Sequence, residues 1–339
     1  MAGIAKILAA LWRAVWRELR SLNSLTGNNF FLVCMLLMLQ PQSAYFLLLL
    51  MSVLLLFPLS SDPMSKIPPS RLALWPLTRT HLIVLRVASF WLSPVVWIAA
   101  AIILWAARPV MGVQFFLIAA AFHLASIGVS AMIARVPATN LFLHIPPIPT
   151  HLGRLVRKNI RETLSMLDPY LAAMMALCGL VYRIVKPDAD KDAFLGVALL
   201  TVLAMSTYGQ CLFALDSGSG FTRYKLLPLE GWRILAAKDA AFLLVLFPLV
   251  LPLAPVAGLA AGMAALAVGH HASVLHRRPQ PRWRFTGGAS IENGIAQVFC
   301  LVSAGVTTYR THWAFVLVCA AVLAASIWYF GRRLDRQRE

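Results

Sequence analysis

The stretch AFLLVLFPLVLPLAPVAGLAAGMAALAVG, residues 241–269, decides the class of fold, because it contains no charged side chain over 29 consecutive positions. A helix needs about 20 mostly apolar residues to cross the hydrocarbon core of a bilayer. The stretch is too long for one such helix, and its prolines break it near the middle. It therefore predicts two consecutive membrane-spanning helices.

The rest of the chain has the same character. Of its 339 residues, 60% are hydrophobic and 13% are charged, whereas soluble proteins carry about 25% charged residues. Cutting the sequence at its charged and Pro-rich segments predicts an all-α polytopic membrane protein. It has about ten transmembrane helices, near residues 25–40, 43–60, 84–107, 110–133, 169–185, 194–214, 237–254, 256–272, 291–309 and 312–331.

The distribution of charge sets the orientation of these spans. The formal net charge is +17. With ten spans, all but five of the 30 basic residues fall on one side of the membrane, and the five exceptions are Arg108, Arg183, Lys186, Lys191 and Arg310. Residues 30–57 are predicted to form a hairpin of two spans that turns at Pro41. A single span there would place the basic loop at residues 60–86 on the side opposite the basic N-terminus. The positive-inside rule then predicts an inner-membrane protein with both termini in the cytoplasm. The charge faces anionic lipid, and no nucleic acid is expected as a partner.

A pattern around a Pro-Leu pair occurs twice, 152 residues apart. The first copy is RLALWPLTRTHLIVLR at residues 71–86, and the second is RYKLLPLEGWRILAAK at residues 223–238. Each has a basic residue five positions before the proline and another ten positions after it. Upstream of each copy an acidic residue ends a span, at Asp62 and at Asp216, and an amphipathic basic helix opens each half.

The recurrence predicts two unequal parallel repeats, of four and six spans. The opening helices are expected at residues 11–22 and 152–164. The expected division is a first membrane repeat at residues 1–135, a Pro-rich cytoplasmic connector at 136–150 and a second membrane repeat at 151–339.

Proline is favoured at the first position of a helix, so Pro76 and Pro228 are predicted to begin short helices at the cytoplasmic membrane surface. The neighbouring leucines would anchor these helices, and their polar side chains would face solvent or a partner. An ordinary interfacial loop is the alternative. The residues expected to dock a partner are Pro76, Leu77, Arg79, His81, Pro228, Leu229, Glu230 and Arg233.

The segments at residues 60–86 and 213–242 resemble the coupling region of ABC exporter membrane subunits of the type 2 permease class. In that family an amphipathic elbow helix precedes the first span, and a Pro-containing coupling helix after the second span contacts a cytoplasmic ATPase. The resemblance implies that this chain is the permease subunit and not itself an enzyme. ATP and Mg²⁺ would bind a separate ATPase, in two copies, so this chain would hold no cofactor. A second permease chain could complete the pore.

The chain lacks the GxxxxGK[ST] phosphate loop that an ATPase needs. It also lacks HExxH and GxSxG, so a membrane-embedded enzyme is disfavoured. A non-transporting scaffold subunit is the remaining alternative, since it would have the same spans and loops.

Polar side chains within spans are costly and mark either interhelical hydrogen bonds or a substrate path. We favour hydrogen bonds, and the residues that would line a path are His123, Ser126, Ser130, Tyr208, Gln210, Asn293 and Gln297. The glycines of the GxxxG motif, Gly258 and Gly262, predict close helix packing.

No metal site is expected, because the cysteines lie in apolar runs without a CxxC pair. His270, His271 and His276 precede a group of arginines, which favours a solvated interfacial cluster. Glu292 is the only carboxylate near a predicted span on the inner side of the last hairpin of the second half. A proton relay would need further buried carboxylates, and none is expected in the spans, so a proton-coupled carrier is disfavoured.

Overall fold

The computed structural model describes residues 7–13, 77–92, 113–114, 117, 120, 146, 149–150, 152–185, 191–216, 224, 229–276, 286–288 and 290–337. The chain divides into two compact units. The first comprises Met1–Leu22 with Leu32–Thr139, and the second comprises Asn23–Phe31 with Asn140–Glu339. The spans predicted at 25–40 and 43–60 lie outside the described residues, as do most of those at 84–107 and 110–133.

In the first unit, a helix at residues 7–13 packs against α6, Arg79–Trp91. The contact is apolar and centres on buried Leu11 and Leu85, with Leu77 packed beside them. The predicted basic helix at residues 11–22 is thus described as far as residue 13, and it begins earlier than predicted.

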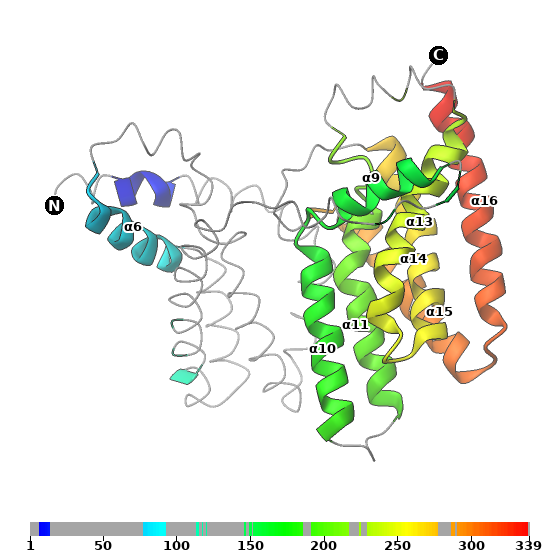
Figure 1. The fold of residues 1–339 in the computed structure, drawn as a ribbon, viewed down its shortest axis with the longest axis horizontal. Helices are drawn as coiled ribbons and strands as arrows, with labels where there is room; N and C mark the ends of the chain where they lie inside the picture. The colour runs from blue at the N-terminus through cyan, green and yellow to red at the C-terminus, as the bar shows by residue number, and fades with distance from the viewer. Residues whose placement is uncertain are drawn as a thin grey trace. The chain divides into compact units, whose positions relative to one another are not determined.

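The described residues of the second unit form six long helices and one shorter helix. Figure 1 shows the shorter helix lying across one end of the bundle that the long helices form. The described elements of the chain are all helices, so the all-α class is confirmed for that part. The helices of this unit are α9 Gly153–Thr163, α10 Asp168–Val185, α11 Lys191–Gly209, α13 Gly231–Val250, α14 Pro255–Leu275, α15 Ile291–Arg310 and α16 Phe315–Arg336.

Helix α9 lies at an angle of 78° to α10, which follows it. Figure 1 shows α9 crossing the end of the bundle where α11, α14 and α16 end and where α13 and α15 begin. We call this end the α9 end.

Helix α14 is the centre of the bundle and packs against α11, α13, α15 and α16. It begins with Pro255, a favoured first residue of a helix. A Cβ atom at Gly258 would lie 2.7 Å from Val250 Cβ, and Gly262 faces Leu246 with even less room. The close packing predicted from the GxxxG motif is therefore confirmed, between α13 and α14.

Three described helices, α11, α14 and α16, are long and apolar enough to cross a membrane, and a fourth is gained if α9 and α10 form one bent span. Helices of this length and composition are typical of membrane proteins. Helix α13 is also apolar on average, but it carries three charged side chains, Arg233, Lys238 and Asp239, in its first half.

A separate short helix was expected after each Pro-Leu pair. For the second pair this expectation is wrong, because α13 runs without a break from Gly231 to Val250. For the first pair it stays a prediction, since α6 runs from Arg79 to Trp91 and residues 93–112 lie outside the described ones. Pro76 and Pro228 themselves lie outside the described residues. The two helix starts, Arg79 and Gly231, are 152 residues apart, which is the offset between the two Pro-Leu patterns.

Candidate functional site

The first turn of α13 carries an exposed polar and aromatic cluster. Glu230 accepts a hydrogen bond from the Trp232 indole at 2.6 Å and forms an ion pair with Arg233 at 3.1 Å. The Arg233 guanidinium lies 5.3 Å from the centre of the Trp232 ring. Trp232 is 40% exposed, and both charged side chains are about half exposed. We call these three residues the surface cluster.

The backbone beneath the surface cluster is held by the end of α16. The Gly231 N–H, which has no partner within its own helix, donates to Asp335 Oδ1 at 2.7 Å. A Cβ atom on Gly331 would lie 2.5 Å from Trp232 Cα, so the two helices touch backbone to backbone. The start of α13 is therefore fixed against α16.

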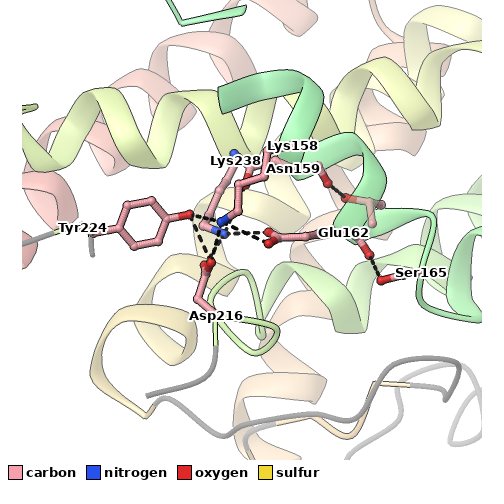
Figure 2. A network of polar contacts seen from close by, with 8 residues as sticks. Lys158, Asn159, Glu162, Ser165, Asp216, Tyr224 and Lys238 are labelled. Carbon is pink, nitrogen blue, oxygen red and sulfur yellow. Dashed lines mark hydrogen bonds and ion pairs between the residues drawn. The ribbon is translucent and has the colours of Figure 1, made fainter. Parts of the chain in front are cut away.

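About two turns further along α13, side chains from three segments form a network that we call the lysine-carboxylate cluster (Figure 2). Lys238 Nζ lies 2.7 Å from Asp216 Oδ2. Lys158 Nζ, from α9, lies 2.7 Å from Asp216 Oδ1 and 3.0 Å from Glu162 Oε1. Tyr224 accepts a hydrogen bond from Lys158 at 2.8 Å and donates one to Asp216 at 3.1 Å.

Two cations and two carboxylates balance in this cluster, so its charges are compensated. Lys238 is 1% exposed and Asp216 is 2% exposed, whereas Lys158 is 46% exposed. A buried charge that loses its partner destabilises a protein by about 3–5 kcal/mol. The cluster therefore joins α9, the segment after α11, and α13 strongly.

The electrostatics are consistent with fixed ion pairs. Burial alone would raise the pKa of the Asp216 carboxyl, but Lys238 and Lys158 outweigh burial and hold that pKa below its ordinary value. Burial alone would lower the pKa of Lys158, but its bonds to Asp216 and Tyr224 and the charge of Glu162 raise that pKa above its ordinary value. Both groups are charged at neutral pH.

An apolar contact accompanies the cluster. Val156 of α9 packs against Ala237 and Ala241 of α13, with Leu155 and Ile160 around them. In the first unit, Leu11 packs against Leu85 of α6 in the same way. Each described Pro-Leu region is thus followed by a helix against which a short N-terminal helix of its unit packs.

The residues expected to dock a partner are only partly described. Leu229, Glu230 and Arg233 lie together at the start of α13, while Leu77, Arg79 and His81 lie at the start of α6. Leu77 packs against the cluster around Leu85, as an anchoring residue would.

Four of the residues considered for a substrate path are described, and three of them are buried. Gln210 donates to Gln297 at 2.7 Å, and Gln297 donates to the carbonyls of Ser206 and Ala265. Tyr208 stacks on Phe242 with ring centroids 6.4 Å apart. Asn293 bonds to Ser290 at the start of α15. The bonds of Gln210 and Gln297 are interhelical hydrogen bonds of the kind that we favoured, whereas the bond of Asn293 is local to the start of α15. His123, Ser126 and Ser130 lie outside the described residues.

Two expectations about titratable groups are wrong. His270 is fully buried, whereas His271 and His276 are exposed as expected. The second half also contains a buried carboxylate in a predicted span, since Asp239 is 2% exposed and pairs with His270.

In the sequence, Asp216 and Lys238 belong to the repeated Pro-Leu pattern and Lys158 lies in the basic helix predicted at residues 152–164, but the pattern does not pair them. A signal was present, because a lysine within a predicted span requires a carboxylate partner. Glu162 and Tyr224 were not among the residues that the sequence analysis singled out.

No protein-family profile, curated protein or solved structure matches the chain.

The contacts at the α9 end connect an exposed cluster to the buried part of the bundle. An exposed cluster stands on a helix that enters the bundle, and ion pairs fasten that helix to another helix lying across the bundle end. Through these contacts the surface cluster is connected to α13, α9 and α16 together.

Proposed function

We propose that the chain is the permease subunit of an ATP-driven ABC exporter of the type 2 class, with a partner ATPase docking on the surface cluster. The observation that carries the proposal is the contact between α9 and α13 at the α9 end. A basic amphipathic helix lies across the bundle there, bound by ion pairs to the helix that follows a Pro-Leu loop. This is the layout that the elbow and coupling regions of such permeases have.

The proposal includes the finer organisation inferred from the sequence. The chain has about ten spans in two parallel repeats, its α9 end faces the cytoplasm, and both termini lie on that side of the inner membrane. The matching 152-residue offset of the starts of α6 and α13 supports the repeat. The packing of a short helix on each of them supports it as well.

In this function the chain moves its substrate and makes no covalent chemistry. ATP and Mg²⁺ bind two copies of the ATPase, whose closure pushes on the two helix starts and shifts the bundle between inward-facing and outward-facing states. One chain serves both ATPase copies or pairs with a second permease chain.

Co-purification tests the proposal. The intact chain, purified from native membranes in mild detergent, should carry a soluble protein with a phosphate loop and measurable ATP hydrolysis. The double variant Trp232→Ala, Arg233→Asp should reduce the recovered ATPase at least about tenfold, the effect of losing about 1.4 kcal/mol of binding free energy.

A matched control lies at the opposite end of the bundle. There Arg310 pairs with Asp192 near exposed Trp313, as Arg233 pairs with Glu230 near Trp232. The variant Trp313→Ala, Arg310→Asp should leave ATPase recovery unchanged. Recovery of other proteins but no ATPase would favour the scaffold alternative and overturn the proposal.

A further inference from the structure

A second polar cluster lies inside the bundle, where three helices meet. His270 of α14 points its Nε2 at Asp239 of α13, 3.1 Å from Oδ1 and 3.0 Å from Oδ2. Its Nδ1 lies 2.8 Å from Ser326 Oγ of α16. Ser326 Oγ lies in turn 3.0 Å from the carbonyl oxygen of Ala267, one turn before His270 on α14. The Phe330 ring meets His270 edge to face.

The other charged side chains near His270 and Asp239 have partners of their own. On α13, Lys238 binds Asp216 and Glu162 and so does not neutralise Asp239. On α14, His271 is exposed and its ring packs against His276 and Phe330. Three further charged groups, on α16, pack on aromatic rings or cap α13: Arg332 on Trp328, Arg333 on Tyr329, and Asp335 on the Gly231 N–H.

The remaining helices against α13 and α14 also present titratable groups with other contacts. Lys158 and Glu162 of α9 belong to the lysine-carboxylate cluster. Tyr208 of α11 stacks on Phe242, and Asp168 of α10 accepts hydrogen bonds from Thr286. Glu292 of α15 is exposed. Asp239 is therefore the carboxylate that faces His270.

Counting hydrogens gives two arrangements for the same heavy atoms. An ionised carboxylate only accepts hydrogen bonds, so His270 Nε2 carries a proton in both. In the first arrangement Nδ1 is bare and accepts the Ser326 hydroxyl proton. In the second, Nδ1 carries a proton and donates to Ser326 Oγ, and the hydroxyl turns to donate to the Ala267 carbonyl. The two differ by one proton, and each leaves every member of the chain bonded.

We propose that Asp239, His270 and Ser326 form a proton-binding site inside the helix bundle. A proton from aqueous solution forms a bond with His270 Nδ1, the Ser326 hydroxyl reorients to the Ala267 carbonyl, and release returns the proton to solution. The bare site buries one net negative charge, and the loaded site is a neutral imidazolium-carboxylate pair.

The site extends what the chain does beyond the proposed docking of an ATPase and does not depend on it. It joins α14 to α13 and α16, the two helices that meet beneath the surface cluster. Proton occupancy converts a hydrogen-bonded contact among them into an ion pair, so it strengthens the attachment of α13 to α14.

NMR of the intact chain in lipid nanodiscs, with ¹⁵N-labelled histidine rings, tests the proposal directly. His270→Gln identifies the His270 signals, and His271→Gln is the control at the exposed neighbour. We expect His270 to have one protonated nitrogen at alkaline pH and two at acid pH. Asp239→Asn should weaken the binding of the second proton at least about tenfold, because the counter-charge is lost.

Ser326 provides a second test, since it is only partly buried and its replacement disturbs the packing little. Ser326→Ala should also weaken proton binding, because the protonated Nδ1 loses its acceptor, and Ser326→Thr should restore it. A His270 ring that keeps one protonation state throughout the pH range in which the protein stays folded would overturn the proposal. An unchanged proton affinity in a folded Asp239→Asn or Ser326→Ala variant would overturn it as well.

Discussion

Lys238 and Lys158 bind the same carboxylate from different environments, and this difference gives a test at the residue scale. Replacing Lys238 with Met would leave Asp216 without its fully buried partner, and we expect a loss of about 3–5 kcal/mol in unfolding free energy. Lys158→Met removes a cation that is 46% exposed, and exposed ion pairs contribute about 1 kcal/mol or less. Thermal unfolding in detergent compares the two variants. Equal losses of unfolding free energy would contradict a stronger contribution from the buried ion pair of Lys238 with Asp216.

The same cluster predicts a specific pH dependence. The pKa of Asp216 is lowered, so the stability from its charge is present above its ordinary pKa and is lost as the pH falls through the lowered value. The pKa of Lys158 is raised, so its contribution is present below its ordinary pKa and is lost as the pH rises through the raised value.

Between about pH 5 and pH 9, therefore, the difference in melting temperature between the wild type and Asp216→Asn should stay constant. Below about pH 4 the difference should narrow, as the wild-type carboxyl itself takes up a proton. A difference that varies around neutral pH would show that the carboxylate is not held in fixed ion pairs.

Residue types and positions could be predicted from the sequence better than residue pairs. The sequence placed Asp216 at the end of a span and Lys238 in the next one, but the bond between them depends on how separate helices pack. Asp239 was missed because it adjoins Lys238. Successive residues on a helix point about 100° apart, so Lys238 reaches the lysine-carboxylate cluster while Asp239 reaches α14.

At the scale of elements, the contact between α13 and α16 depends on Gly231 of α13 and Gly331 of α16. A methyl group at Gly331 would overlap the backbone of Trp232, so Gly331→Ala should separate the helix ends and cost about 1–3 kcal/mol. At Gly196 of α11, an added Cβ meets nothing within 4 Å. Gly196→Ala should therefore stabilise by up to about 1 kcal/mol through helix propensity.

Melting temperatures of the two variants in the same detergent provide the comparison. A Gly331→Ala protein as stable as the wild type would mean that α16 is free to move away from α13. In that case Asp335 would not fix the first turn of α13, and the surface cluster would have no rigid base.

Helices were found at the positions of all six spans predicted for the second half, because long apolar runs have few alternatives to a helix. Their ends were less predictable. Helix α13 begins six residues before the predicted start, since Asp335 of α16 satisfies the Gly231 N–H. Hydropathy cannot reveal such a cap from a distant helix. Helix α11 ends at Gly209, five residues before the predicted end, where Gln210 turns toward Gln297.

For the whole molecule, the proposed parallel repeat requires that both Pro-Leu regions face the same side of the membrane. Exposed Thr78 and Glu230 lie 152 residues apart, each one position before its helix. After replacement of the five native cysteines, Thr78→Cys and Glu230→Cys should react with a membrane-impermeant maleimide only when spheroplasts are permeabilised. Thr311→Cys, in the exposed turn between α15 and α16, should react without permeabilisation.

The labelling separates three arrangements of the chain. Parallel repeats place both tested positions in the cytoplasm, since the positive-inside rule acts alike on two basic loops. Inverted repeats would expose Thr78→Cys to the outside while Glu230→Cys remained protected. Reaction of Glu230→Cys in intact spheroplasts would reverse the whole second unit and place the surface cluster out of reach of any cytoplasmic ATPase. The proton-binding site would survive that reversal, because its three side chains belong to the interior of the bundle.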